Sequence, residues 1–561
     1  MPKLYDLTIT NGKIVDGTGN PWFKGDLAVK GEKIVKIGRT DPRSAKAAID
    51  ASGKIVSPGF IDSHSHSDFS LIFDQYAEST IKQGITTLVV GQCGMSLAPI
   101  NRKFESLLRR YAAPFLPDPN IEIPWTTFKQ YLAKMKRLRC TSNTVHLVGH
   151  GTVRIAAMGF VEREPNRGEL QNMKDMVAEA MKAGATGMST GLIYPPGVFS
   201  KTKELIELTQ VVAKYGGPYF SHIRGEGPSL INAVKEAIEI GEKTATPVQI
   251  SHHKAAGRRT WGKLKETLQL MEDARSRGVD VTYDQYPYTA GMTSLATLLP
   301  PWVHEGGMDK LLERVRNDET WMRIRGELER GTPDRENILE EAGWDRIVIS
   351  SVKSEPLKQV EGKSLAEITK MLGKPDEFTA LRSLLLEDRG GSTMIMFSMD
   401  EADVEYAMKG RYHMVGTDAW SVSPTGPLSS GKPHPRFYGT YPRILGQYVR
   451  TKQILTLEDA IRRMTSLPAQ RVGLRGRGLL REGFFADIVV FDAETVIDKA
   501  TFDQPAQFPE GIEKVLVNGE IAVDSGELTK ARPGKVLLRE HQAATDSSTS
   551  YRRSFAVEPP D

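Results

Sequence analysis

The sequence predicts an α/β protein: a (β/α)8 TIM barrel, with a small β-sandwich domain formed by both chain termini and a helical insertion. Three observations predict this architecture. Both ends of the chain carry short β-strand patterns, the middle alternates apolar strands with helical patterns, and one charged stretch of the middle is long and helix-prone. A length of 561 residues also favours more than one domain.

The two ends of the chain share one texture. In residues 1–60, Val, Ile and Thr alternate with polar residues, and Asn-Gly and Lys-Gly pairs mark the turns, as in YDLTITNGKIVDG and GDLAVKGEKIVKIG. Residues 440–540 repeat this texture in ADIVVFD and IEKVLVNGEIAV. We therefore predict one small β-sandwich domain from residues 1–60 plus 440–540.

The middle of the chain, residues 61–439, predicts the barrel. Two clear amphipathic helices, ELQNMKDMVAEAMKAG and SLINAVKEAIEIGEKT, lie among its strands. Polar residues able to do chemistry fall at or just after the strand ends, the edge that carries the active site in such barrels. The predicted strands are TTLVVG, TVHLVG, ATGMSTG, PYFSHI, PVQISHH, VDVTYDQY and HMVGTDA.

Two segments do not fit a minimal barrel. Residues 301–400 are charged and helix-prone, as in DKLLERVRNDETWMRIRGELERG, and we interpret them as barrel helices plus an inserted helical subdomain. Residues 541–561 are polar and turn-rich, which predicts a mobile tail.

Composition excludes several classes of function. The formal charge of +4, from 74 basic and 70 acidic residues, leaves no electrostatic footprint for nucleic acid. Two cysteines predict no disulfide framework and favour a reducing compartment. The chain shows neither a signal-peptide pattern nor an apolar run of membrane-spanning length, so we expect a cytoplasmic protein without a membrane partner.

A set of metal-ligand residue types follows the predicted strands. PGFIDSHSHSD carries a His-x-His pair whose side chains point to opposite faces of a regular strand, so both reach one metal only if the strand end twists or bulges. A thiolate, imidazoles and a carboxylate at later strand ends together suit Zn²⁺. The six candidates are His64, His66, Cys93, His222, His252 and Asp418.

At these residues the chain resembles the D-aminoacylases, the N-acyl-D-amino-acid deacylases of the amidohydrolase superfamily. The His-x-His pair is common to the superfamily, whereas the cysteine in GQCG, the SHHK segment and the HPR block are specific to this branch. The matching segments are GFIDSHSHSD, GQCGMSLAP, GHGTVR, STGLIYPPG, SHIRGEG, SHHK, DQYPYTAG, GTDA and HPRFYGTYPRIL.

The resemblance implies roles for the six candidates. Cys93, His222 and His252 should hold one tight zinc, with His253 as the fallback for His252. His64 and His66 should offer a second, weaker position that Cys93 can bridge, where many relatives use a carboxylated lysine. Asp418 should sit over the metal and act as general base and acid. The implied reaction is zinc-dependent hydrolysis of an N-acyl-D-amino acid to a carboxylate and a free D-amino acid, without an organic cofactor.

Substrate recognition requires a partner for the α-carboxylate. The candidates are Arg224, Lys254, Tyr194 and Tyr286, of which Arg224 and Lys254 each follow a metal candidate by two positions. Met292 departs from the small polar residue that relatives often carry after YPYxAG. It predicts a pocket that favours apolar side chains or longer acyl groups.

Four further residues are expected to support the metal site rather than to act on substrate. His434 and Arg436 should position the loop that carries Asp418 or close the pocket, and His150 should brace the metal site by hydrogen bonding. His253 completes this group.

Two alternative functions remain open at this stage. A cyclic-amide hydrolase, such as a hydantoinase or dihydroorotase, would share the barrel and the His-x-His pair but should carry a lysine where this chain has a thiol. A non-catalytic barrel serving as a binding scaffold would be expected to have lost ligands, and this chain retains all six. The sequence determines neither the acyl group nor the side chain of the substrate, and it is compatible with a homo-oligomer.

Overall fold

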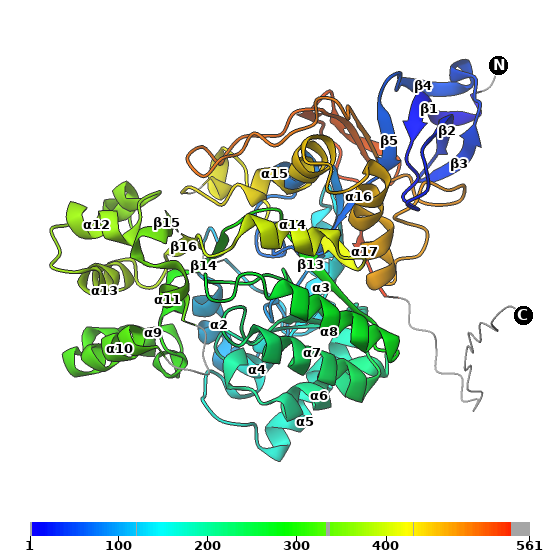
Figure 1. Ribbon diagram of the computed structural model, residues 1–561. Helices are drawn as coiled ribbons and strands as arrows, with labels where there is room; N and C mark the ends of the chain where they lie inside the picture. The colour runs from blue at the N-terminus through cyan, green and yellow to red at the C-terminus, as the bar shows by residue number, and fades with distance from the viewer. Residues whose placement is uncertain (1–2, 119–120, 332–336, 430, 540–561) are drawn as a thin grey trace, which may run out of the picture.

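The computed structural model describes residues 3–118, 121–331, 337–429 and 431–539. Parallel strands form two sheets, and Figure 1 labels β13, one of these strands, near the middle of the molecule. One has the order β22-β8-β7-β6 and the other the order β17-β13-β12-β11-β10-β9. The strands are β6 (Phe60–Asp62), β7 (Ile85–Val90), β8 (Asn143–His146), β9 (Val148–Gly149), β10 (Met188–Gly191), β11 (Tyr219–His222), β12 (Val248–Ile250), β13 (Val281–Gln285), β17 (His413–Val415) and β22 (Val536–Leu537).

Backbone hydrogen bonds join the two sheets at both ends. At one end β8 and β9 follow each other directly, and Leu147 N donates to Val90 O at 2.9 Å while Val148 N donates to Gly187 O at 3.0 Å. At the other end Asp418 N donates to His64 O at 2.8 Å, which places the segment after β17 beside the segment after β6. The carboxyl ends of all these strands therefore meet on one side of the molecule.

Helices cover the parallel strands. All six residues of β7 are buried, as expected for a parallel strand covered on both faces. Helix α5 is capped at its N-terminus by Asn166, which exchanges hydrogen bonds with Glu169, and at its C-terminus by Gly184, which has a φ of 112°. The helices are α1 (Glu78–Ile81), α2 (Glu105–Ala112), α3 (Phe128–Leu138), α4 (His150–Met158), α5 (Arg167–Ala183), α6 (Thr202–Ala213), α7 (Leu230–Thr244), α8 (Leu264–Ser276) and α14 (Glu401–Lys409).

Both ends of the chain contribute to a third, nine-stranded sheet. Its order is β21-β20-β19-β18-β5-β1-β2-β3, with β4 beside β1, so β5 and β18 join the N-terminal strands to the C-terminal ones. The strands are β1 (Tyr5–Ile14), β2 (Phe23–Lys30), β3 (Lys33–Gly38), β4 (Ala45–Asp50), β5 (Ile55–Pro58), β18 (Ile488–Phe491), β19 (Ile512–Val517), β20 (Glu520–Asp524) and β21 (Glu527–Leu528).

The C-terminal part differs from the sequence prediction in two ways. Residues 440–487, expected to belong to the β-domain, are largely helical, because apolar residues there recur at helical rather than alternating spacing. In addition, β22 pairs with β8 rather than with the nine-stranded sheet. The helical elements are α15 (Arg436–Arg443), a π-helical segment (Ile444–Thr451), α16 (Leu457–Met464) and α17 (Ser466–Arg471). The predicted mobile tail, residues 541–561, lies outside the described residues.

The insertion is larger than predicted and not purely helical. It begins at β14 and contains an antiparallel sheet of order β14-β16-β15, with a hydrophobic cluster of its own that includes Leu311, Trp321 and Leu381. Figure 1 shows it at the left, away from the N-terminal strands at the upper right. Its elements are β14 (Gly291–Ser294), α9 (Met308–Arg316), α10 (Asp318–Arg330), α11 (Ile338–Ala342), β15 (Ile347–Ser351), α12 (Leu365–Met371), α13 (Glu377–Glu387) and β16 (Thr393–Met396).

Short 3-10 turns complete the described chain, at Pro42–Ser44, Arg102–Phe104, Gly197–Phe199, Leu295–Leu298, Pro301–His304, Trp344–Arg346, Glu355–Val360 and Gly426–Leu428. No helix in the described ranges combines the length and apolar character that crossing a bilayer requires.

His146, at the end of β8, gives a stability prediction. Its buried ring lies 3.2 Å from the Tyr131 hydroxyl through Nδ1 and 2.9 Å from Thr144 Oγ1 through Nε2, and burial lowers its pKa to about 3. The unfolded chain binds this proton with a pKa of about 6.5. Stability should therefore be lost as the pH falls below about 6.5, by about 2 kcal/mol through this residue between pH 7 and pH 5.

Urea unfolding of the wild type and of His146→Gln at both pH values measures this contribution. Glutamine keeps a hydrogen-bonding amide but does not titrate, so the variant should lose about 2 kcal/mol less than the wild type on acidification. Equal losses in the two proteins would contradict the assignment of a buried neutral imidazole.

Candidate metal centre

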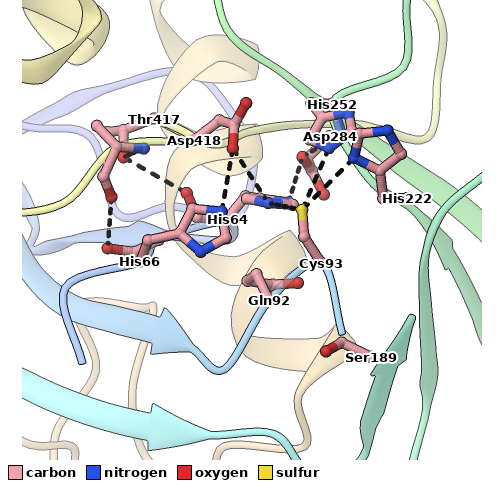
Figure 2. Close-up of polar contacts among 12 residues, drawn as sticks. His64, His66, Gln92, Cys93, Ser189, His222, His252, Asp284, Thr417 and Asp418 are labelled. Atoms are coloured by element: carbon pink, nitrogen blue, oxygen red, sulfur yellow. Dashed lines mark hydrogen bonds and ion pairs between the residues drawn. The ribbon is translucent and has the colours of Figure 1, made fainter. Parts of the chain in front are cut away.

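The Cys93 thiol lies at the centre of a cluster of imidazoles (Figure 2). Its Sγ is 3.3 Å from His64 Nε2, 3.4 Å from His252 Nε2 and 3.7 Å from His222 Nδ1. Two sets of donor atoms, each within 4.8 Å of one another, could hold a metal ion, and Cys93 belongs to both. The sets are Cys93, His222 and His252, and His64, His66, Cys93 and Asp418.

The spacing of the donors suits zinc. Tetrahedral Zn²⁺ with Zn–S of about 2.3 Å and Zn–N of about 2.0 Å places sulfur and nitrogen ligands about 3.5 Å apart. The distances from Cys93 Sγ to the nitrogens of His252 and His222, 3.4 and 3.7 Å, lie close to this value. The residues present therefore fit a zinc ion held by one thiolate and two imidazoles.

The strand ends place these donors. His222 is the last residue of β11, His252 follows β12 by two residues, and Cys93 and Asp418 each follow their strand by three. After β6 the chain leaves the extended conformation, which brings the His64 and His66 rings to a centroid distance of 5.4 Å. The bend that a shared metal requires of this His-x-His pair is thus present.

Three of the candidate ligands have a left-handed backbone. Cys93, His252 and Asp418 have φ values of 52°, 35° and 50°. Residues other than glycine rarely adopt positive φ, and such conformations persist where the surroundings impose them, often at functional sites. Here the turn directs each side chain from its strand end toward the common centre.

Two buried carboxylates orient the ligand rings from behind. Glu226 Oε1 lies 2.9 Å from His252 Nδ1 and accepts a hydrogen bond from Lys254 Nζ at 2.6 Å. Asp284 Oδ1 accepts from the His252 backbone N–H at 2.7 Å and lies 3.3 Å from His64 Nδ1. Partners of this kind fix the tautomer and the orientation of metal-binding histidines.

A third carboxylate, Asp62, holds the two loops of the second set together. It accepts hydrogen bonds from Thr417 Oγ1 at 2.6 Å, from Thr417 N at 2.8 Å and from His64 N at 3.2 Å. The loop after β6 and the loop after β17 are thereby fixed against each other, which sets the separation of His64 from Asp418.

The electrostatics of the cluster favour a Cys93 thiolate beside positively charged imidazoles. Burial opposes ionisation of Cys93, but the charges of His64 and His252 bring the pKa of its thiol well below the usual range. Burial likewise disfavours a charged His66, yet hydrogen bonds with Asp418 and Cys93 raise its pKa to about 9. A divalent metal that binds this thiolate can take the place of the protons on the neighbouring imidazoles.

Asp418 stands between the histidine cluster and an arginine. Its Oδ1 lies 3.4 Å from His64 Nε2 and 3.3 Å from His66 Nε2, and its Oδ2 lies 2.9 Å from Arg436 Nη1. Burial would raise the pKa of Asp418, but Arg436 and His252 hold it well below the usual range. The carboxylate is therefore ionised and fixed at both oxygens.

A two-lobed cavity opens beside Asp418. The larger lobe is mainly apolar, and the smaller one reaches Glu226 and Lys254. Tyr194, Met292 and Asp418 line both lobes. A substrate that spans the lobes would therefore pass directly over the candidate metal ligands.

The structure separates the four candidates for carboxylate binding. Lys254, Tyr194 and Tyr286 line the cavity, but Arg224 does not. Arg224 donates from Nε and Nη2 to Glu236 of α7, at 2.8 and 2.9 Å. The chain turns after β11 instead of continuing extended, so the expectation that Arg224 faces the substrate is corrected.

The four residues expected to support the metal site fall into two groups, one that contacts the loop of Asp418 and one that does not. Arg436 contacts Asp418, and His434 accepts a hydrogen bond from Arg436 N at 3.0 Å, in line with loop positioning. His150 instead pairs with Glu204 of α6, 2.8 Å from Nε2, because α4 begins at His150 and directs its ring toward α6. His253 pairs with Thr267 of α8 at 2.8 Å, on the side of β12 away from the cluster. Neither braces the metal ligands.

Glu226, Asp284 and Asp62 were missed in the sequence, although each lies within or beside a motif already singled out. Glu226 follows His222 by four positions in SHIRGEG, and Asp284 begins DQYPYTAG at the end of β13. Their position at strand ends was the available signal. Their role depends on pairing with ring nitrogens from other strands, which spacing along the chain does not reveal.

The chain is similar to known amide hydrolases over nearly its whole length. Residues 47–523 match the model of the Amidohydrolase family. The D-aminoacylase of Alcaligenes xylosoxydans xylosoxydans is 35% identical over 539 residues, which cover 95% of this chain and 98% of that protein.

Two solved structures resemble this chain closely. The N-acyl-D-glutamate deacylase of Bordetella bronchiseptica, complexed with zinc and a phosphonate mimic of the tetrahedral intermediate, aligns with a TM-score of 0.79 and 35% identity over 95% of this chain and 100% of that one. A D-aminoacylase structure concerned with a binuclear metal centre, one-metal activation and second-metal attenuation also aligns with a TM-score of 0.79, at 34% identity over 95% of this chain and 100% of that one.

Proposed function

The chain belongs to the Amidohydrolase family, and on this premise we propose that it hydrolyses N-acyl-D-amino acids to a carboxylate and a free D-amino acid. The observation that carries this proposal is the Cys93 cluster, with Asp418 on its open side facing the cavity. The chain's similarity to a D-aminoacylase and to a zinc-complexed N-acyl-D-glutamate deacylase supports the choice of substrate class.

The metal would be zinc, in one tight and one weaker position. Cys93, His222 and His252 would hold the tight ion, and His64, His66 and Asp418 would complete a second position that shares Cys93. Zinc supplies Lewis acidity and lowers the pKa of a coordinated water to about 7. One-metal activation and second-metal attenuation, described for the related D-aminoacylase, agree with this ranking of the two positions.

Asp418 would carry the proton transfers. As general base it takes a proton from the attacking water, whose oxygen bonds to the carbonyl carbon of the amide. The C–N bond then breaks, and Asp418 returns the proton to the departing nitrogen. Arg436, 2.9 Å from Oδ2, holds the carboxylate ionised and oriented for the first step.

The α-carboxylate of the substrate would bind between two cations. Arg436 and Lys254 lie over the ring of Tyr286, with their charged groups 4.6 and 5.6 Å from its centroid. Arg436 is almost fully buried beside the cavity, and its Nε forms no hydrogen bond to another described residue. The planar donor fork of a guanidinium suits a carboxylate.

The finer fold assignments made from sequence also remain proposals. We assign the joined parallel strands to a (β/α)8 barrel and the nine-stranded sheet to the predicted domain formed by both termini; the site's place at the carboxyl ends of the strands agrees with this. A cytoplasmic location and a homo-oligomeric assembly stay predictions from the sequence.

The two alternative functions are less well supported. A cyclic-amide hydrolase would be expected to carry a lysine at the centre of the cluster, where this chain has the thiol of Cys93. A non-catalytic scaffold would not need three ligand-bearing residues in left-handed backbone conformations.

A chiral assay on zinc-loaded protein tests the proposed function. N-acetyl derivatives of the D and L forms of Met, Leu, Phe, Glu and Asp are compared with hydantoin. We expect turnover of the D-amino acid series with preference for the apolar members, since Met292 lines both lobes. Turnover of the L series alone, or of hydantoin alone, would overturn the proposal. A preference for D-Glu and D-Asp would contradict only the expected effect of Met292.

Arg436→Met should lower kcat/KM for N-acetyl-D-methionine by about 50-fold, through the lost charge-assisted hydrogen bonds to the α-carboxylate. The variant also loses a contact to Asp418, so N-acetyl-D-methioninamide serves as the reference substrate. For this neutral amide, the fold-loss in kcat/KM caused by Arg436→Met should be about 10 times smaller than for N-acetyl-D-methionine. Arg224→Met, which removes an arginine paired outside the cavity, is the matched control. Equal losses on both substrates would contradict carboxylate binding by Arg436.

A further inference from the structure

The two lobes of the cavity differ in chemistry. The larger is walled by Phe69, Met95, Tyr111, Phe115, Met308 and Trp420, which we call the aromatic lobe. Apart from His304, its ionisable imidazole, thiol, carboxylate and guanidinium groups all belong to the metal end. The smaller lobe contains Glu226, Lys254 and Glu341. The smaller lobe thus combines charged side chains with apolar ones, whereas the larger lobe is mainly apolar away from its metal end.

The wall of the aromatic lobe is made of interlocked rings. Phe115 packs edge-on against Trp420 at a centroid distance of 5.5 Å, and its ring is tilted against that of Phe69 at 6.3 Å. Trp420 packs edge-on against Phe437 at 4.7 Å. Because each of these rings packs against another ring, the arrangement of the wall should change little when a ligand enters. Segments far apart in the sequence therefore form a preformed apolar surface that begins at Asp418.

The insertion closes this lobe from the other side. Met308, at the start of α9, and Ala296 form part of its lining. Arg110 of α2 donates to Asp309 of α9 at 2.9 Å, and Lys353 Nζ donates to Leu116 O at 2.9 Å. These contacts hold the segment that carries Tyr111 and Phe115 against the insertion.

Lys254 in the smaller lobe indicates which half of the substrate lies there. The amino-acid half carries the α-carboxylate, which the proposed function places between Lys254 and Arg436 over the ring of Tyr286. Lys254 and Tyr286 line the smaller lobe, and Arg436 lines the larger lobe at its metal end. In the proposed reaction the carbonyl would lie at Asp418, which lines both lobes. The group on the other side of the carbonyl is the acyl chain, and it therefore enters the aromatic lobe.

We propose that the aromatic lobe is an acyl-chain site and that the enzyme prefers N-acyl-D-amino acids with aliphatic acyl groups much longer than acetyl. This rests on the proposed function and adds its substrate class. The reaction is unchanged: water adds to the carbonyl carbon, the C–N bond breaks, and a fatty acid and a D-amino acid are released. Each methylene that enters the lobe leaves water for an apolar wall.

The test is a chain-length series on zinc-loaded enzyme, with D-methionine as the constant amino acid. Acetyl, butanoyl, hexanoyl and octanoyl substrates are compared. We expect kcat/KM to rise about two- to fourfold per methylene until the lobe is filled, mainly through a lower KM. A second arm compares N-acetyl-D-alanine with N-acetyl-D-norleucine, which places the added methylenes on the amino acid instead. A larger gain in that arm than in the acyl arm would assign the lobe to the side chain and overturn the proposal.

Met308→Trp tests the lobe itself. The larger side chain should fill the space beside Ala296 and lower the octanoyl-to-acetyl ratio of kcat/KM by about 10-fold. Met322→Trp is the matched control, because Met322 lies on α10 of the same insertion but is 64% exposed. Zinc content and unfolding temperature verify that both variants fold. An unchanged ratio in Met308→Trp would overturn the proposal.

The outcomes separate the two proposals. A flat or falling chain-length profile, on enzyme that does turn over N-acetyl-D-methionine, overturns the acyl-chain site and leaves the proposed function intact. No turnover of any N-acyl-D-amino acid would instead refute the proposed function.

Discussion

Asp418→Asn should lower kcat by about 10³-fold while the protein still folds and binds zinc at the tight position. Asparagine keeps the shape of the side chain and can still accept hydrogen bonds, but it cannot take up and return a proton. Because Cys93, His222 and His252 form the tight set without Asp418, zinc content after dialysis should remain near that of the wild type. The measurements are steady-state kinetics on N-acetyl-D-methionine and metal analysis of the same samples.

A second buried aspartate provides the control for this variant. Asp403 of α14 accepts hydrogen bonds from Gly262 N at 2.8 and 3.0 Å and belongs to neither metal-ligand set. Asp403→Asn should reduce stability and leave kcat within about threefold of the wild type. If Asp418→Asn kept more than a tenth of wild-type kcat, Asp418 could not be the group that moves the proton.

The six metal candidates could be predicted because their signals are local. Each lies at or just after the end of a short apolar strand, and the predicted barrel brings the carboxyl ends of its strands to one side, so residues far apart in the chain were expected to meet. The structure brings His64, His66, Cys93 and Asp418 into one set and Cys93, His222 and His252 into the other. No knowledge of helix packing was needed for this step.

Arg224 and Arg436 show where local reasoning fails. Both are arginines near a candidate ligand, and chain spacing favours Arg224 because it follows His222 by two positions. Glu236, on the helix after β11, accepts hydrogen bonds from both Nε and Nη2 of Arg224. Arg436, the first residue of α15, forms an ion pair with Asp418 instead. The choice depends on which carboxylate lies within reach in three dimensions, and chain spacing carries no information about it.

The insertion and the aromatic lobe were hidden for a related reason. The strand TMIM of β16 is too short to be distinguished from a buried helical turn, so only the helices around it were expected. The walls of the lobe, such as Phe69, Phe115 and Trp420, have no periodicity in common and meet only through tertiary packing. Sequence reasoning singled out Tyr194 and Met292 in this region, together with the residues of its metal end.

The two cysteines form a natural matched pair for the final prediction. Both are buried, free thiols, 4% and 5% exposed. Burial raises the pKa of Cys140 to about 12, as expected for a thiol in apolar surroundings. At Cys93 the surrounding histidines reverse the effect of burial, and the pKa of the thiol lies well below the usual range. Only Cys93 is therefore prepared to be a thiolate ligand.

Cys93→Ala should abolish tight zinc binding and lower kcat by about 10³-fold or more, since both candidate positions lose their shared ligand. Cys140→Ala removes a sulfur of the same size from an equally buried place and should lower the unfolding temperature without changing zinc content or kcat. Zinc per chain after dialysis against a weak chelator, and kcat at saturating zinc, distinguish the two. If Cys93→Ala retained one tight zinc and wild-type turnover, the histidines and Asp418 would have to hold the catalytic ion without a thiolate, and the proposed order of the two positions would be reversed.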